Sequence, residues 1–243
     1  MYFMVLFHYR RSQDRQELHF PFSTCPYKNH VNYPEPADRH FARGMLKSWG
    51  LNVPIQRSSF GESMSESSDN ARLCELAVTS GMIDPKVIEV KNIVLGEWVR
   101  WKCRYGCPDY GLWLKCPPYS PTPAETQALL REYKRALIFR MKPTSGYTGT
   151  HVVGKVYKTL ADLETKIFLS GHRKALAFGG GECDLCKTCN IRSGHCRRPD
   201  IARPSMEGCG IDVFGTAQRA GYEMSILKNK NAEFTWFGMI LVD

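Results

Sequence analysis

Hydrophobic and polar residues begin to recur regularly near Ala71, and this pattern continues to the end of the 243-residue chain. In the segment ARLCELAVTSGM, Leu73, Leu76 and Ala77 recur at helical spacing and Gly81 follows them, which predicts a short helix. Cys74 lies on the same face, where we interpret it as a small buried hydrophobe.

Several later apolar runs predict strands. Residues 136–141 (ALIFRM) and 175–181 (ALAFGGG) are apolar at successive positions, which predicts strands buried on both faces. The segment FTWFGMILVD (234–243) predicts a closing strand, and the segments KVIEVKNIVL and EWVRWKC predict extended chain as well.

Helices are predicted between these strands. The run Thr122-Pro123-Ala124-Glu125 is a capping box with proline at the first helical position. Apolar residues from 152 to 167 recur at helical spacing before Gly171, and a further helix is predicted over roughly 208–220. This order predicts an α/β (or α+β) domain with a mixed or mostly parallel sheet flanked by helices, and cysteine-rich loops at the strand ends.

The first 70 residues differ from the rest. The segment FGESMSESSDN (60–70) is polar and rich in serine, which is typical of a linker. We expect residues 1–70 to be a poorly ordered or extraneous extension and residues 71–243 to form a cysteine-rich domain. The alternative for residues 1–63 is a genuine subdomain, which limited proteolysis would reveal as a protected fragment.

Composition and charge set broad limits on function. The apolar content of 43% is that of a globular protein, and the net charge of +9 suits an acidic partner. A redox protein is the partner that we expect; nucleic acid is more weakly supported, because no run of five or more Lys and Arg occurs. The sequence contains neither a membrane span nor a secretory signal, so we expect a cytoplasmic protein with reduced thiols and no membrane association.

Eight of the ten cysteines fall in two groups. Two intervening residues let successive thiolates turn toward one metal centre. We therefore expect residues 71–243 to be a cysteine-rich metal-binding domain with its metal loops at the strand ends. The run Cys-x2-Cys-x2-Cys is also the opening of the bacterial ferredoxin motif, so we favour one or two [4Fe-4S] clusters as the cofactor. The first group is Cys103, Cys107 and Cys116, and the second is Cys183, Cys186, Cys189, Cys196 and Cys209.

Two other interpretations of these cysteines stay open. Structural zinc favours paired knuckles about 12–20 residues apart, whereas this chain has a triple followed by irregular gaps. Disulfides would need an oxidising compartment. Cys209 lies near the start of the predicted helix over 208–220, where the helix dipole is expected to lower its pKa and favour ligation.

Eight thiolates are enough for two clusters of four ligands each. The natural division joins Cys103, Cys107 and Cys116 to either Cys196 or Cys209 and keeps the other four together. The spacing does not decide which cysteine crosses over. The other arrangement is a three-thiolate cluster whose fourth iron is open to a small ligand.

Other residues near the cysteines allow two interpretations each. Five aromatic residues near the first group would either shield a cluster from water or pack a core. Three arginines after Cys196 would either offset cluster charge or form a solvated basic face, and His195 would be either a ligand or a surface residue. The aromatic residues are Trp101, Tyr105, Tyr110, Trp113 and Tyr119, and the arginines are Arg197, Arg198 and Arg203.

Residues from about 72 to 243 resemble a family of uncharacterised predicted metal-binding proteins, domain of unknown function 2284. The likeness lies in the strings EWVRWKCRYGCPDYG, KCPPYSPTPAET, CDLCKTCN, CRRPDIARPSMEGCGIDVF and FGMILVD. The resemblance implies a cysteine-ligated metal centre at the eight cysteines of the two groups and does not supply a reaction.

Three functions follow as expectations. The first is an iron–sulfur protein for intracellular electron transfer or the redox subunit of a larger enzyme. The second is an enzyme that uses an open iron as a Lewis acid or sulfur-handling centre. The third is a zinc-stabilised binding module without catalysis. The sequence contains no phosphate loop, dinucleotide glycine motif, serine-hydrolase elbow or HExxH motif, so catalytic residues are not assigned.

Overall fold

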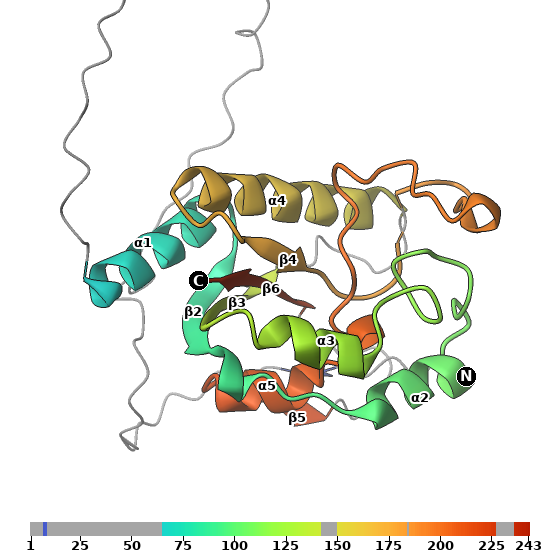
Figure 1. Cartoon of the computed structure of the whole chain (residues 1–243), viewed down its shortest axis with the longest axis horizontal. Coiled ribbons are helices and arrows are strands. Elements are labelled where there is room, and N and C mark those ends of the chain that lie inside the picture. Colours follow the sequence, from blue (N-terminus) through green and yellow to red (C-terminus); the bar gives the residue numbers. More distant parts are fainter. Residues whose placement is uncertain (1–6, 9–64, 142–149, 184, 227–235) are drawn as a thin grey trace, which may run out of the picture.

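The computed structural model in Figure 1 describes residues 7–8, 65–141, 150–183, 185–226 and 236–243. Its centre is a four-stranded sheet in the order β2-β3-β6-β4, in which every neighbouring pair is antiparallel. The four strands are β2 (Ile83–Glu89), β3 (Arg135–Met141), β4 (Leu176–Phe178) and β6 (Trp236–Val242). A second, two-stranded sheet pairs β1 (Phe7–His8) with β5 (Ser225–Ile226).

The prediction of a mixed or mostly parallel sheet is wrong for the four-stranded sheet. Strands β3 and β4 point the same way, because both are antiparallel to β6, and α4 (Thr150–Leu169) lies between them in the chain. They leave one strand position between them, and β6 fills it in the opposite direction. The predicted strand–helix–strand order is therefore correct. It does not reveal that β6, the last strand in the chain, inserts between β3 and β4.

Helices cover both faces of the sheet, as Figure 1 shows. On one face, α1 (Glu66–Thr79) and α4 pack on alternate residues of β3, of which Leu137 and Phe139 are fully buried. On the other face, Ala136 and Ile138 pack with α3 (Pro123–Leu130) and α5 (Val213–Arg219). Burial on both faces explains the continuous apolar run of β3, as its sequence predicted.

Helix boundaries follow local signals where these exist. Thr122 and Glu125 form the predicted capping box: the Glu125 N–H donates to Thr122 Oγ1, and the Thr122 N–H donates to Glu125 Oε2. The helix α1 begins at Glu66, after the N-cap Ser65, so residues 66–70 are helical rather than part of a linker. Residues 9–64 lie outside the described part of the chain, and the expectation of a disordered extension there stays a prediction.

Two local predictions are wrong. The segment EWVRWKC is helical and belongs to α2 (Glu97–Gly106), of which only Val99 is buried. The predicted helix over 208–220 is two elements, a 3-10 turn η3 (Glu207–Cys209) and α5, which starts after its N-cap Asp212. Short 3-10 turns also occur at η1 (Val90–Asn92) and η2 (Ile191–Ser193). None of the helices described here has the length and apolar character needed to cross a bilayer.

Candidate metal centre

The first cysteine group lies on α2 and the loop after it, rather than at the end of a strand as predicted. Cys103 is in the last turn of α2, and the N–H of Cys107, the C-cap, donates to the Cys103 carbonyl at 3.2 Å. The loop then returns to Cys116 and is closed by a hydrogen bond from the Gly111 N–H to the Pro117 carbonyl at 3.0 Å. The three cysteines line one cavity of about 150 Å³.

A single arginine fixes α2 against the neighbouring elements. Arg100 Nη1 donates to the Ser120 carbonyl at 3.0 Å and to the Gly208 carbonyl at 2.9 Å. The first bond holds the loop that carries Cys116, and the second holds η3. These tertiary contacts explain why a segment rich in Trp and Val is helical here, because they outweigh its local preference for extended chain.

The rest of the cavity wall comes from four other parts of the chain. The end of β4 runs into Gly180 and Gly181, which lie beside η3 because the Met206 N–H donates to the Gly179 carbonyl at 2.9 Å. Apolar walls surround the polar groups. The residues that line the cavity besides the three cysteines include Trp98, Tyr110, Ser205, Glu207, Ile211, Val213, Trp236 and Phe237.

The second cysteine group follows β4. Cys183 is 8% exposed, while Cys186, Cys189 and Cys196 are partly exposed. The Leu114 N–H, from the first loop, donates to Cys189 Sγ at 3.4 Å, so the two cysteine-rich segments are in direct contact. Figure 1 shows both segments at the same end of the molecule, beyond the right-hand end of α4.

Three cysteine sulfurs have the backbone N–H of the second following residue close by. Arg198 donates to Cys196 at 3.3 Å, and the N–H groups of Asp109 and Leu185 lie close enough to Cys107 and Cys183 to lower the pKa of those thiols. An N–H aimed at sulfur favours the thiolate over the thiol. The two cysteine groups thus share one local backbone arrangement, although their sequences differ.

Burial has the opposite effect on these thiols. Loss of water contact raises the pKa of Cys103 and of Cys116 to about 12, and it raises the pKa of Cys107 and of Cys183 as well. The charge of Cys183 is close enough to contribute to the raised pKa of Cys116. The thiols are therefore protonated at neutral pH, and binding of a metal releases their protons.

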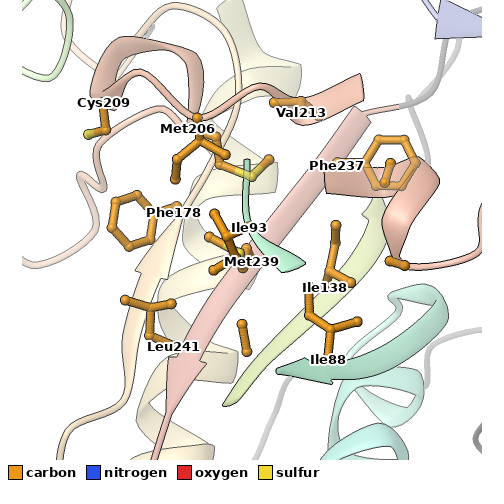
Figure 2. Packing of buried hydrophobic residues seen from close by; sticks show 14 of the residues in the cluster. Ile88, Ile93, Ile138, Phe178, Met206, Cys209, Val213, Phe237, Met239 and Leu241 are labelled. Atoms are coloured by element: carbon orange, nitrogen blue, oxygen red, sulfur yellow. The ribbon is translucent and has the colours of Figure 1, made fainter. Parts of the chain in front are cut away.

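Cys209 lies apart from the cavity. It is fully buried among apolar residues of the α3–α5 face, near Met206 and Phe178 in Figure 2, and it is not among the residues that line the cavity. Burial raises its pKa to about 12, although a hydrogen bond with the Thr126 side chain opposes this. The expectation of a lowered pKa at a helix start is wrong, because Cys209 ends η3 and precedes α5 by four residues.

Within the described residues, no group of three or more His, Cys, Asp or Glu side chains is arranged as it would be around a bound metal ion. The structure thus brings Cys103, Cys107 and Cys116 to one cavity, and it places Cys183, Cys186, Cys189 and Cys196 in a neighbouring loop. Their role as ligands stays a prediction.

Neither shielding of a cluster nor core packing fits the aromatic residues that are exposed to solvent. Trp101 and Tyr105 are 61% and 70% exposed and contact each other on the surface of α2. Tyr119 is also exposed, whereas Tyr110 lines the cavity and Trp113 Nε1 donates to Asp109 at 3.3 Å.

The arginines after Cys196 mainly hold the second loop in place. Arg197 donates to the Thr188 carbonyl at 2.7 Å, and Arg198 forms an ion pair with Asp200. Arg203 Nε donates to Glu164 Oε2 at 2.6 Å, which ties the loop to α4. His195 is exposed, and its Nδ1 lies 2.7 Å from the Ser193 carbonyl.

Two charged residues at the site were not predicted from the sequence. Lys115 is buried, donates to the Tyr157 hydroxyl and lies 3.7 Å from the centre of that ring. Glu207 lines the cavity, and its Oε2 is buried with no hydrogen-bond partner among the residues that the structure describes. Burial lowers the pKa of Lys115 and raises that of Glu207. The only sequence signal is their position within two residues of Cys116 and Cys209.

The chain belongs to the family described as predicted metal-binding protein (DUF2284), whose model matches residues 86–242. No curated protein and no solved structure matches the chain. The matched range includes every cysteine of the two groups and excludes α1. Metal binding is therefore the coarse function that the comparison supports, and it agrees with the resemblance seen in the cysteine motifs.

Proposed function

We propose that this member of the DUF2284 family holds one or two [4Fe-4S] clusters and works in cytoplasmic electron transfer, alone or as the redox subunit of a larger enzyme. The observation that carries the proposal is the repeated position of a backbone N–H near the sulfur two residues earlier, at Cys107, Cys183 and Cys196, with a hydrogen bond of 3.3 Å at Cys196. The partner that we expect is a redox protein, with nucleic acid as the weaker alternative.

This repeated N–H position points to thiolates because a neutral thiol is a weak acceptor that gains little from such a donor. In iron–sulfur proteins, hydrogen bonds to the ligating sulfurs tune the reduction potential of the cluster. The backbone that follows each of these three cysteines folds in the same way. This repetition suits metal ligation better than simple packing.

The cavity favours a centre with several metal atoms. Cys103, Cys107 and Cys116 face a space of about 150 Å³, whereas a single zinc ion sits directly among its four ligands. The buried Glu207 Oε2 on the same wall, which has no partner in the described part of the chain, also fits a positively charged group in this space. We propose that Cys103, Cys107 and Cys116 hold one centre and that Cys183, Cys186, Cys189 and Cys196 hold a second. When bound, such clusters supply one-electron redox chemistry.

The test is elemental analysis of the full chain, purified without oxygen. We expect brown protein with about four or eight irons per chain and an equal amount of acid-labile sulfide. A triple Cys103→Ser, Cys107→Ser, Cys116→Ser variant should lose about half the iron of a two-cluster protein. A triple Cys183→Ser, Cys186→Ser, Cys189→Ser variant should lose the other half.

The control for these variants is Cys74→Ala, which removes a buried, disulfide-bonded cysteine from the α1 core and leaves both groups intact. It should keep the full iron content. Colourless wild-type protein with stoichiometric zinc and no sulfide would contradict the proposal and would favour the zinc-stabilised binding module.

A specific observation also favours the second function, an enzyme that uses an open iron. Beyond the three cysteines, the cavity continues along an apolar wall formed by Ile211, Val213, Trp236 and Phe237. Small-molecule sites are commonly concave and apolar with a few polar groups. A change in the cluster spectrum on addition of cyanide would support this function, and an unchanged spectrum would favour electron transfer alone.

A further inference from the structure

The first cysteine group supplies three thiolates to its cavity, so the fourth ligand is the open question. Four cysteines of the second group, from Cys183 to Cys196, lie together in one loop and are sufficient for a cluster of their own. By spacing, Cys209 is then the remaining candidate for the first cluster. The structure, however, places a different side chain from the same turn at the cavity.

Cys209 and Glu207 lie at the two ends of η3, which has three residues per turn. Side chains two positions apart in such a turn point in directions about 120° apart. Cys209 is fully buried in the apolar cluster of the α3–α5 face, beside Thr126 of α3. Glu207 lines the cavity. The turn therefore presents a carboxylate, not a thiol, to the three cysteines.

The carboxylate of Glu207 is close to the first cysteine group. Its charge contributes to the raised pKa of both Cys103 and Cys107. The N–H groups of Gly181 and of Glu207 itself lie close enough to the carboxyl to lower its pKa, against the larger effect of burial. Its Oε2 is buried and has no hydrogen-bond partner within the described residues.

A buried carboxylate oxygen without a partner is costly, because it loses water and gains nothing in return. Such atoms are rare in folded proteins, and where one occurs a bound ion often supplies the missing partner. Lys115 is a nearby cation, but its ammonium donates to the Tyr157 hydroxyl instead. The partner that Oε2 lacks is therefore best supplied from the cavity.

We propose that Glu207 is the fourth protein ligand of the cavity-side cluster, together with Cys103, Cys107 and Cys116, and that Cys209 is a core residue. This inference rests on the proposed function. It makes one iron of the cluster different from the other three, because a carboxylate is a harder and more exchangeable ligand than a thiolate. A site of this kind suits the open-iron function, since the carboxylate can give way to a small ligand.

The experiment compares Glu207→Gln with Cys209→Ala in the full chain, loaded with iron and sulfide without oxygen. Glu207→Gln should lose about one iron per chain and show the EPR signal of an oxidised three-iron cluster. Cys209→Ala should keep the wild-type iron content and EPR spectrum. Glu207→Cys should restore the four-iron cluster, because it offers a thiolate from the same position.

The outcomes separate this inference from the proposed function. Wild-type protein with clusters, an unchanged Glu207→Gln variant and a three-iron Cys209→Ala variant would overturn the inference alone. Wild-type protein with zinc and no sulfide would overturn the inference together with the proposed function. Thermal melting and circular dichroism of each variant show that a change in iron content does not come from unfolding.

Discussion

Lys115 has a buried amino group whose pKa depends on charges in both cysteine groups. Burial lowers its pKa, and the charges of Cys116, Cys183, Glu207 and Glu182 oppose this effect. In the metal-free chain the thiols are protonated and offer little compensation. Loaded thiolates are negative, so they favour the charged ammonium, which in turn stabilises the more negative, reduced state of a cluster.

Replacement of Lys115 by Met should therefore lower the reduction potential of the cluster. A unit charge about 7–14 Å from the cluster, at an effective dielectric constant of about 20, corresponds to a one-electron shift of roughly 50–100 mV. Voltammetry of the loaded protein measures the shift. Lys102→Met is the matched control: Lys102 also lines the cavity but is exposed, so solvent screens its charge and its shift should be smaller. Equal shifts in the two variants would contradict this role of Lys115.

At the scale of elements, α3 connects a local capping signal to the candidate site. Thr122 and Glu125 start the helix, and one turn later the Thr126 hydroxyl donates to the Cys209 carbonyl at 2.8 Å. This bond ties α3 to η3, the turn that also carries Glu207. The helix is thus a support for the cavity wall rather than part of the cavity.

Thr122→Ala should lower the free energy of unfolding by about 1 kcal/mol. The Glu125 N–H loses Thr122 Oγ1 as its acceptor, and the Glu125 side chain is held less well against the N–H of residue 122. The melting temperature should fall by about 2–4 °C for a domain of this size. Iron content should stay unchanged, since no proposed ligand moves. Thr159→Ala, in the interior of α4, is the control, because its hydroxyl donates to the Lys155 carbonyl and caps no helix. A loss of iron in Thr122→Ala would show that α3 shapes the site more directly.

The elements that the sequence predicts correctly are those with a local cause. The capping box of α3, the apolar stripe of α4 and the doubly buried run of β3 each depend on residues that are neighbours in the chain. The antiparallel sheet depends on where β6 inserts, and α2 depends on Arg100 contacts with residues about 20 and 108 positions away. Such long-range contacts leave no local pattern.

The same distinction holds for the candidate site. The cysteine spacing is local, and Cys103, Cys107 and Cys116 all line one cavity, but their role as ligands stays a prediction. The side on which η3 presents Glu207 and hides Cys209 depends on how that turn packs against α3. A sequence shows two residues two positions apart and cannot distinguish which one faces the cavity.

At the scale of the whole molecule, the described domain is larger than the part that the family model matches. The match begins at residue 86, but α1 contributes Leu73, Cys74 and Ala77 to the core beneath β3 and α4. Strand β2 also begins before the match, at Ile83. We infer that α1 and the whole of β2 are part of the folding unit that positions both cysteine groups.

A chain that begins at Met64 should therefore fold cooperatively and keep the full iron and sulfide content, with a melting temperature within about 3 °C of the full chain, a change of less than about 1 kcal/mol. It loses the pairing of β1 with β5, whose Ser225 and Ile226 are exposed, and it keeps the sheet and both core faces. A chain that begins at residue 86 should fail to fold, because removal of α1 uncovers Leu137 and Phe139. Calorimetry with a thiol reductant present, followed by metal analysis, measures both properties. If the chain from Met64 lost its clusters, the N-terminal residues would have to be counted as part of the working protein.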